Sequence, residues 1–326
     1  MEVVTLSGTP TEMGRQYGQM LEKAGFTPPS ASPAQRQFVN NSLPIIEEAF
    51  PAVIDELRSI AEIGEWDFDS IAAIPIALGL DAGCSVVAFA GDVNGGSPLF
   101  GRNYDFSTEF ADFATLYRTR PSEGLSHVGC SDHWTGRHDG INEVGLAVGH
   151  SFVPHRGLRP GLMFTLATRA VLETCKTVFE GVQFLEGVPH SRNTNFLLAD
   201  RTGSIAVVEA SPEEVTSWYP ETVGVATNHF QSSCMARHQP EDDGHTESQS
   251  RLAAIHNRID AVLPQFSLDE LQEMLSDPDT GVCVCSDTGG LTDIETIWSW
   301  TVELDSFELF LSSGRPDTNP YVKVDW

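Results

Sequence analysis

The first eighty residues place apolar side chains with the period of an α-helix. Over residues 11–24 apolar side chains recur every three or four positions, and the same period returns over 43–63, with a break near Pro51, and over 68–78. The stretch 25–37 is rich in proline and serine and predicts a loop. We therefore expect a mainly helical N-terminal region.

The pattern changes at Cys84, where short runs of apolar and β-branched residues begin. The segments "CSVVAFA" and "PLFGRNYDF" flank the turn-rich "GDVNGG", which predicts a β-hairpin. The strands of a hairpin are antiparallel, so the end of the second strand returns to the start of the first. We therefore expect Arg102 and Asp105 to lie beside Cys84.

The rest of the chain mixes strand and helix patterns. Strands are predicted at 141–148, 195–198 and 205–209, helices at 163–174 and 252–262, and a strand pair with a tight turn within 296–314. This order predicts an α+β fold in which one sheet packs on another. The main shift in pattern falls between Gly83 and Cys84.

The charge of the chain bears on its partners and its habitat. There are 46 acidic residues against 19 basic ones, which gives a net charge of −27, and only three of the basic residues are lysines. Such a field repels nucleic acid and anionic membranes, so we expect neither as a partner. The acidic residues are scattered along the chain, which is typical of a surface that stays hydrated at multimolar salt. We therefore expect a halophilic, archaeal protein.

The N-terminal segment and the cysteines indicate a compartment. "MEVVTLSGTP" lacks the basic and apolar regions of a signal peptide. No apolar segment approaches the ~20 residues that a membrane-spanning helix needs. The six cysteines lack the dense, regular spacing of a disulfide scaffold. These patterns predict a cytoplasmic protein with reduced cysteines.

Cys84 differs from the other cysteines in its neighbours. A nucleophilic thiol needs a base and cationic surroundings, and the hairpin contributes Arg102 and Asp105 but no histidine. One suitable base is the α-amine of Cys84 itself, freed by cutting the Gly83–Cys84 bond, because an α-amine has a pKa of about 7.7–8.0. Glycine before the cysteine suits self-cleavage, since it has no Cβ and leaves its carbonyl open to the thiol.

Six segments together resemble the isopenicillin N acyltransferase family of cysteine N-terminal-nucleophile hydrolases, which is related to the choloylglycine hydrolases and penicillin V acylases. In chain order they are "GTPTEMGRQYG", Gly83-Cys84, "GRNYDF", "DGINEVGLAVG", "ATNHF", and "SGRP" followed by Tyr321. The resemblance covers nearly the whole chain. It implies a four-layer αββα N-terminal-nucleophile hydrolase sandwich, with residues 1–83 as a helical propeptide packed on the core and 84–326 as the catalytic domain.

The resemblance also implies a role for individual residues. Cys84 would be the nucleophile and, after self-cleavage, the residue whose α-amine is the base. Asp105 would orient that amine, and Arg102 would stabilise the thiolate. Asn228 would donate its side-chain amide to the oxyanion of the tetrahedral intermediate, a contact typically worth ~2.7–4 kcal/mol of barrier. Arg251 matches an arginine of the relatives more loosely and is carried over as a further catalytic residue.

Two positions depart from the pattern of the relatives. Ser85 stands where they have threonine after the cysteine. His150 stands where bile salt hydrolases have asparagine and penicillin V acylases have tyrosine, so their substrate preference is not carried over. We assign His150 and His229 to substrate binding, with a structural role as the alternative for His229.

Each candidate also has a structural interpretation when it is taken alone. Asp105 could accept hydrogen bonds at the end of a strand, Arg102 could pair with an acid, and Asn228 could cap a turn. Their combination with Gly83 and Cys84 favours catalysis.

Two further groups of residues were considered as metal ligands. The segment "CSDHWTGRHDG" spaces four potential ligands at intervals that suit a metal: Cys130, His133, His138 and Asp139. It lacks a second pair with matching spacing, so solvent-facing histidines in a loop are expected instead. Cys283 and Cys285 are two positions apart, which predicts one face of a strand and burial rather than metal binding. We therefore expect no metal and no organic cofactor.

The sequence thus predicts a self-processing cysteine amidohydrolase or acyltransferase that acts on a linear amide or acyl donor through an S-acyl-Cys84 intermediate. Expected partners are that small molecule, the cleaved N-terminal chain and, as an option, further copies of the protein. Two alternatives stay open. One is an unprocessed, catalytically silent homologue that binds acyl amides or scaffolds a partner, and the other is a cysteine peptidase that pairs Cys84 with His150 or His229.

Overall fold

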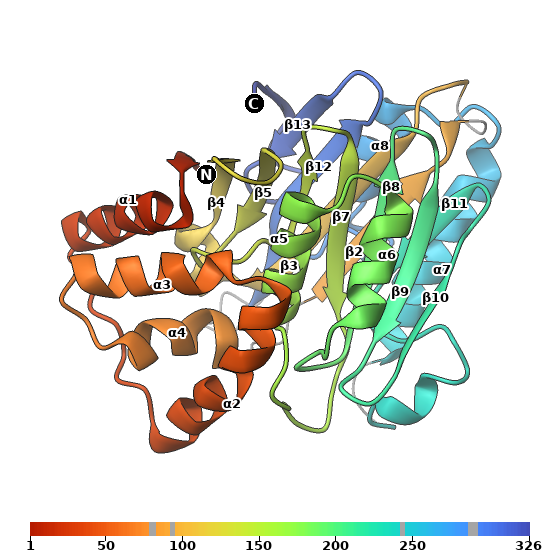
Figure 1. The fold of residues 1–326 in the computed structure, drawn as a ribbon. Coiled ribbons are helices and arrows are strands. Elements are labelled where there is room, and N and C mark those ends of the chain that lie inside the picture. The colour runs from red at the N-terminus through yellow and green to blue at the C-terminus, as the bar shows by residue number, and fades with distance from the viewer. Residues whose placement is uncertain (78–82, 92–94, 242–244, 286–292) are drawn as a thin grey trace.

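Two β-sheets lie face to face at the centre of the molecule, and helices cover their outer faces (Figure 1). The computed structural model describes residues 1–77, 83–91, 95–241, 245–285 and 293–326. Within these ranges the eight-stranded sheet has the order β1 (Glu2–Gly8), β4 (Thr115–Pro121), β5 (His127–Ser131), β6 (Asp139–Asn142), β7 (Leu146–Phe152), β8 (Thr194–Asp200), β9 (Ile205–Ala210), β10 (Val215–Trp218). The six-stranded sheet has the order β11 (Val223–Ala226), β2 (Gly83–Phe89), β3 (Leu99–Ser107), β12 (Ile294–Glu303), β13 (Glu308–Ser312), β14 (Val322–Val324).

The helices divide into an N-terminal group and two covering pairs. The N-terminal group is α1 (Pro10–Lys23), α2 (Pro33–Ala49), α3 (Ala52–Ile63) and α4 (Phe68–Ala77). The covering pairs are α5 (Phe164–Thr174) with α6 (Val178–Gly187), and α7 (His245–Val262) with α8 (Leu268–Leu275). Short 3-10 helices occur at Thr108–Phe113 and Ala236–His238.

Strand β2 shows how the layers are specified by sequence. Val86 and Ala88 point into the core between the two sheets, whereas Val87 and Phe89 point into the core beneath α7 and α8. A strand buried on both faces needs a continuous apolar run, which is what the segment after Cys84 contains. The predicted α+β fold with sheet packed on sheet is confirmed.

The N-terminal helices belong to the core on the other outer face. Met13 of α1 and Leu57 of α3 share one apolar cluster with Leu166 of α5. In addition, β1 pairs in parallel with β4, so the N-terminal region contributes an edge strand to the eight-stranded sheet. Residues 1–77 are therefore part of the folded body.

Two predictions about local structure need correction, and one strand was not predicted. Within the predicted loop 25–37, Pro33 opens α2, because proline fits the first turn of a helix and Ser32 caps it. The predicted strand 141–148 is two strands, β6 and β7, because Gly145 adopts φ +90° in the turn between them. Strand β1 was not predicted, although its burial pattern alternates.

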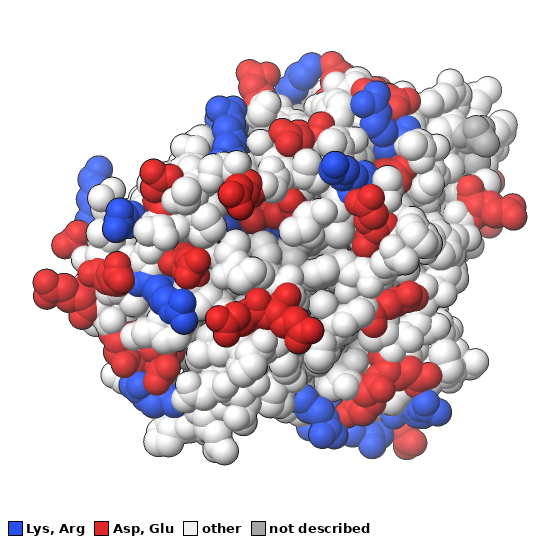
Figure 2. Space-filling model, viewed as in Figure 1, with Lys and Arg blue, Asp and Glu red and all other residues white. Residues whose placement is uncertain are grey.

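Acidic side chains are distributed over the visible surface without forming a single block (Figure 2). This agrees with their scatter along the sequence. No helix in the described part of the chain is long and apolar enough to cross a membrane.

Candidate active site

The β2–β3 hairpin brings the predicted thiol, cation and carboxylate together. In its register Gly83 pairs with Asp105, Cys84 with Tyr104 and Val86 with Arg102. The side chains of Cys84 and Arg102 point to the same face, and Nη2 of Arg102 lies 3.0 Å from Sγ of Cys84. The hairpin prediction and its consequence for Cys84 are confirmed.

Arg102 is held in place from the opposite sheet. Its Nη1 donates to Oδ2 of Asp139 at 2.9 Å and to the backbone oxygen of His138. Asp139 also accepts from Nε1 of Trp298 at 3.0 Å and from the backbone N–H of Cys130 at 3.1 Å. Asp139, considered above as a metal ligand, is thus the carboxylate that fixes the guanidinium beside the thiol.

The thiol of Cys84 is fully buried, as are the side chains of Arg102 and Asp105. Burial raises the pKa of the Cys84 thiol, and the positive charge of Arg102 acts against this shift. In the intact chain the group at rest is therefore a thiol beside a permanent cation. Removing its proton requires a base at the site.

Asp105 has one engaged and one unengaged carboxylate oxygen. Oδ1 accepts a hydrogen bond of 2.6 Å from Oγ1 of Thr296, whereas Oδ2 is buried without a hydrogen-bond partner among the described residues. Burial raises the pKa of this carboxyl, and Arg251 and Thr296 oppose the shift.

Asp105 also explains why glycine precedes the cysteine. A Cβ at Gly83 would lie 3.0 Å from Cβ and 3.2 Å from Oδ2 of Asp105, which is closer than ordinary van der Waals contact, so a larger residue would require Asp105 to shift slightly. The Asp105 carboxylate thus lies directly against the residue at which cleavage was predicted.

Asn228 connects the end of β11 to the backbone of Cys84. Its Oδ1 accepts from the Cys84 N–H at 2.8 Å and from Nη2 of Arg251, and its Nδ2 donates to the backbone oxygen of Phe152 at 2.8 Å. The structure therefore brings Asn228 and Arg251 to Cys84, although neither is close to it in sequence. The role of the Asn228 amide as an oxyanion donor stays a prediction.

His150 ends a chain of three buried polar side chains. Oδ1 of Asp132 lies 2.7 Å from Nε2 of His138, and Nδ1 of His138 lies 3.0 Å from Nε2 of His150. Two nearby histidines hold the pKa of Asp132 well below its usual range despite burial, so Asp132 acts only as an acceptor. Burial lowers the pKa of His138. In its neutral form it donates from Nε2 to Asp132 and accepts at Nδ1 from His150, whose Nδ1 is buried without a partner among the described residues.

His229 contacts helix α7. Its Nδ1 lies 2.7 Å from Oγ of Ser248 and 3.2 Å from Oγ1 of Thr227. These bonds join the end of β11 to the helix that carries Arg251, and they favour the structural interpretation of His229. Substrate contact by either histidine stays a prediction.

Sequence reasoning missed several residues of this site. Tyr104 stacks on Trp298 with ring centroids 3.9 Å apart and donates to Asp132 at 2.8 Å, and Thr296 holds Asp105. A signal existed for Tyr104, because it lies two positions after Arg102 on the predicted strand and so shares a face with it. Thr296 and Trp298 gave none, since they reach the site through the pairing of β12 with β3, two strands that are far apart in the sequence. Asp132 also gave none, since it follows a strand of the opposite sheet.

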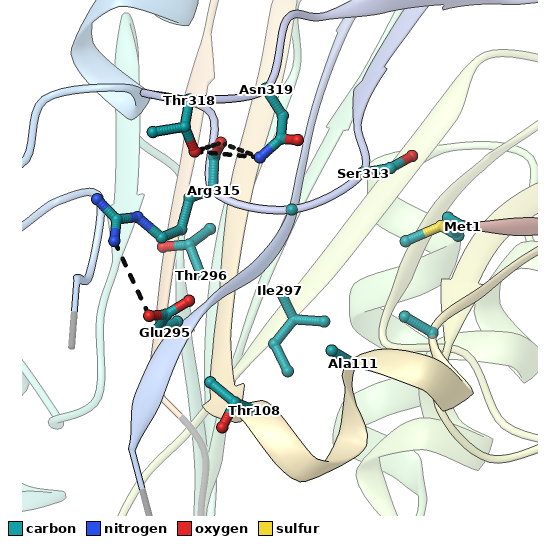
Figure 3. A pocket seen from close by; sticks show the side chains of 12 residues that line it. Met1, Thr108, Ala111, Glu295, Thr296, Ile297, Ser313, Arg315, Thr318 and Asn319 are labelled. Carbon is teal, nitrogen blue, oxygen red and sulfur yellow. Dashed lines mark hydrogen bonds and ion pairs between the residues drawn. The ribbon is translucent and has the colours of Figure 1, made fainter. Parts of the chain in front are cut away.

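A cavity of about 330 Å³ is lined by Glu295, Thr296 and Ile297 of β12 (Figure 3). Met1, Thr108, Arg315 and Asn319 contribute to its lining, together with Thr296, the residue that also contacts the Asp105 carboxylate. Cys84 itself does not line this cavity. A small molecule in it would therefore be separated from the thiol by the Thr296–Asp105 pair.

Among the described residues, two groups of side chains have potential metal-binding atoms within 4.8 Å of one another: Asp132, His133 and His138 in the first, and Cys283, Cys285 and Asp317 in the second. In the first group the carboxylate of Asp132 accepts hydrogen bonds from both histidines. In the second, Cys283 and Cys285 lie in an irregular segment, so the predicted strand is wrong there, while the predicted burial holds for Cys283.

Comparison with known proteins gives a family. The family described as acyl-coenzyme A:6-aminopenicillanic acid acyl-transferase matches residues 93–317. No curated protein matches the chain.

Several solved structures align with the chain. A variant of conjugated bile acid hydrolase from Clostridium perfringens aligns with a TM-score of 0.50 and 14% identity, over 74% of this chain and 97% of that one. Penicillin V acylase from Agrobacterium tumefaciens aligns with a TM-score of 0.45 and 16% identity, over 74% and 86%. The N-acylethanolamine-hydrolyzing acid amidase ortholog of Caenorhabditis elegans aligns with a TM-score of 0.47 and 14% identity, over 68% and 93%.

The family match spans most of the chain and includes Arg102, Asp105 and Asn228, so the predicted resemblance is confirmed. The bile acid hydrolase aligns over nearly its whole length, in agreement with the two-sheet α+β architecture. The chain belongs to the acyl-coenzyme A:6-aminopenicillanic acid acyl-transferase family.

Proposed function

We propose that the protein is a self-processing cysteine amidohydrolase or acyltransferase that uses Cys84 as its nucleophile. The observation that carries this proposal is the arrangement around one residue. The Cys84 thiol contacts the guanidinium of Arg102, and the Cys84 backbone N–H donates to Asn228. Gly83, the preceding residue, lies against Asp105.

The processing step begins with attack of the Cys84 sulfur on the carbonyl carbon of Gly83. The carbon–nitrogen bond then breaks, the thiol proton passes to the departing α-amine, and a thioester of Gly83 forms. Water hydrolyses this thioester, which leaves a carboxylate on Gly83 and a free amine and thiol on Cys84. The products are an N-terminal chain, 1–83, and a catalytic chain, 84–326.

The freed α-amine then acts as the general base. Oδ1 of Asn228 already accepts the single N–H of Cys84, and the unengaged Oδ2 of Asp105 suits a second N–H that exists only after cleavage. A positively charged amine would also lower the raised pKa of Asp105. Holding the freed α-amine would thus be the function of the unpartnered Asp105 oxygen in the cleaved protein.

Turnover would follow the same chemistry with an external acyl amide. The α-amine takes the thiol proton, the sulfur attacks the acyl carbon, and the leaving amine receives the proton. The amide of Asn228 stabilises the oxyanion, and Arg102 favours the thiolate. Water or a second amine then takes the acyl group from the S-acyl-Cys84 intermediate.

The proposed substrate is a small acyl amide. This class follows from the family match and from the similarity in fold to a conjugated bile acid hydrolase. The buried acceptor on His150 suits an N–H or O–H donor on such a ligand.

The N-terminal chain should stay bound after cleavage. Glu56 of α3 receives two hydrogen bonds of 2.7 Å from Arg169 of α5, and all these atoms are buried. Tyr17 of α1 bonds to the backbone of Trp134. Together with the pairing of β1 and β4, these contacts make the two proposed chains parts of one body.

The decisive experiment is the intact mass of the protein under denaturing conditions. Wild type should give two fragments that break between Gly83 and Cys84, and Cys84→Ala should give one intact chain. Cys234→Ala is the matched control, because Cys234 is an exposed cysteine outside the site, and it should be processed like wild type. Intact wild type would remove the α-amine base and support the silent homologue instead.

The peptidase alternative makes a different prediction. A Cys-His pair would lose all activity when its histidine is replaced. In the structure, His150 bonds to His138 and Nδ1 of His229 faces Ser248, while the thiol of Cys84 faces Arg102. We therefore expect His150→Phe and His229→Gln to process normally and to change only the choice of acyl amide.

A further inference from the structure

The second group of potential ligands has the spacing of a metal site. Sγ of Cys283 lies 3.5 Å from Oδ1 of Asp317, and Sγ of Cys285 lies 3.9 Å from Oδ2. Two ligands on a tetrahedral zinc ion, at Zn–S of about 2.3 Å and Zn–O of about 2.1 Å, are separated by about 3.6 Å. Each sulfur therefore lies near one carboxylate oxygen at about the separation that a shared cation imposes, and the three ligand atoms lie within 4.8 Å of one another.

We propose that Cys283, Cys285 and Asp317 bind a thiophilic divalent cation of the zinc class. Two thiolates with one carboxylate favour zinc over magnesium or calcium, which prefer sites made of oxygen atoms alone. Three protein ligands leave one tetrahedral position for water or another group.

The surroundings supply the features that support such a site. Arg315 donates from Nε to Oδ1 of Asp317 at 3.1 Å and from Nη2 to Oδ2 at 2.6 Å, which orients the carboxylate. The same guanidinium lies 3.9 Å from Glu295 at the edge of the cavity (Figure 3). Two thiolates, one carboxylate and a divalent cation carry a net charge of −1, which the adjacent Arg315 balances.

The first group of potential ligands has a different geometry. Nε2 of His138 lies 2.7 Å from Oδ1 of Asp132, which is the length of a hydrogen bond. Nitrogen and oxygen ligands of a tetrahedral zinc ion would be separated by about 3.4 Å. This group is therefore better described as a hydrogen-bonded cluster, and the cysteine group is the stronger candidate.

The cysteine group is also connected to the proposed catalytic carboxylate. Val284, between the two cysteines, accepts from the Thr296 N–H at 3.0 Å and donates its own N–H to Oγ1 of Thr296 at 2.9 Å. The Thr296 hydroxyl accepts from Val284 and can therefore donate its own proton to Oδ1 of Asp105, which lies 2.6 Å from Oγ1. A cation that ties Cys283 and Cys285 to Asp317 would hold Val284 and so position Asp105; this second step rests on the proposed function.

Binding can be tested without any measurement of activity. The full chain, kept reduced with a thiol-free phosphine, is titrated with Co²⁺ alone and then with Zn²⁺. We expect a thiolate-to-cobalt charge-transfer absorption that Zn²⁺ abolishes. Cys285→Ser should weaken binding and remove most of this absorption, and Asp317→Asn should weaken binding at least ~10-fold.

Cys234→Ser is the matched control and should bind like wild type, since Cys234 is exposed and outside the cluster. Cys285 is only partly buried, and circular dichroism will check that its variant is folded. Wild type without the charge-transfer absorption would overturn the site. Equal binding by wild type and a folded Asp317→Asn would overturn the role of the carboxylate.

The connection to Asp105 is tested separately, by the rate of fragment formation in zinc-loaded and chelator-treated wild type. A slower rate after chelation, restored by Zn²⁺, supports the positioning step. Equal rates would overturn that step and leave the metal site standing. Cation binding without any processing would instead count against the proposed function alone.

Discussion

Two fully buried arginines, Arg102 and Arg169, have contrasting surroundings. The guanidinium of Arg169 donates only to carboxylates and a backbone carbonyl. Its Nε bonds to Glu173, and its other two nitrogens bond to Glu56 and to the backbone oxygen of Thr135, all at 2.7 Å. Arg102 instead places Nη2 on a thiol, and its Nε has no partner among the described residues. An arginine whose donors are all hydrogen-bonded serves mainly to hold the structure together. A buried arginine with an unpartnered donor and a thiol contact calls for another explanation, such as a role in catalysis.

The same contrast extends to the acids and bases around each arginine. Oδ2 of Asp105 and Nδ1 of His150 are buried without a partner in the described part of the chain, and both belong to the proposed site. By contrast, the carboxylates of Glu56 and Glu173 both accept hydrogen bonds from the guanidinium of Arg169. Four variants test whether the first region serves reaction and the second serves stability.

The largest effect is expected from Asp105→Asn. The amide keeps the contact with Thr296 but loses the negative charge beside Gly83, which would stabilise the α-amine as it departs and takes up the thiol proton, so the rate of processing should fall about 10²–10⁴-fold. The free energy of unfolding of the precursor should change little, because Oδ2 has no partner to lose. Timed intact-mass spectra and urea unfolding measure the two quantities. Glu173→Gln, in the Arg169 cluster, should process at the wild-type rate.

Arg169→Met should have the opposite profile. It leaves Glu56 and Glu173 buried without their cation, and the free energy of unfolding should fall by about 3–5 kcal/mol. Arg58→Met is the matched control, because its pair with Asp55 is exposed and should cost at most ~1 kcal/mol. Denaturant titration of both variants in a Cys84→Ala background measures this. A loss near that of the control would show that the Arg169 cluster does not hold the N-terminal helices.

A smaller effect concerns pH. Burial and the charge of Arg102 hold the pKa of His150 well below its usual range, so on acidification the unfolded chain takes up a proton near pH 6.5 and the folded chain does not. The free energy of unfolding should therefore fall below pH ~6.5, by about 1.4 kcal/mol per pH unit for this histidine. His150→Phe should make that slope shallower.

His190 provides the comparison for this measurement. Burial lowers its pKa to about 4, so His190→Phe should also make the slope shallower. Its Nε2 bonds to the backbone of Leu185, outside the site, so this variant should keep the wild-type choice of acyl amide. Unchanged slopes in both variants would mean that neither histidine stays neutral on acidification.

The smallest effect is expected from Thr296→Val. It removes one hydrogen bond to the Asp105 carboxylate, worth about 1.5 kcal/mol, so processing should slow about tenfold. Thr301→Val is the matched control on the same strand, since the Thr301 hydroxyl contacts Gln272. Equal rates in the two variants would place Thr296 outside the positioning of Asp105.

The part of the site that the sequence predicted is the part that is local. Arg102 and Asp105 are joined to Cys84 by a hairpin, whose register follows from its own loop and pattern. Asn228 and Arg251 come from β11 and α7, and only the resemblance to a family indicated them. No periodicity in the chain relates such distant segments.

The residues that were missed depend on tertiary packing. Asp139 meets Arg102 because two sheets stack, and Trp298 lies beside Tyr104 because β12 pairs with β3. A single sequence does not show which strands face each other or which distant strands pair. The error at 141–148 has a local cause. Its apolar alternation continues through Asn142 and Gly145, whose turn is fixed by the Asn142 side chain, which accepts from the N–H of Leu146.

The parallel pairing of β1 with β4 has a consequence for folding itself. In the precursor these strands belong to one chain, so their meeting costs only the closure of a loop. After a cut at Gly83 they belong to two chains, and renaturation becomes a second-order reaction that slows on dilution. The processed protein would thus be assembled only once, from its precursor. Its lifetime would then depend on the rate at which the N-terminal chain dissociates, and not on the rate at which that chain binds again.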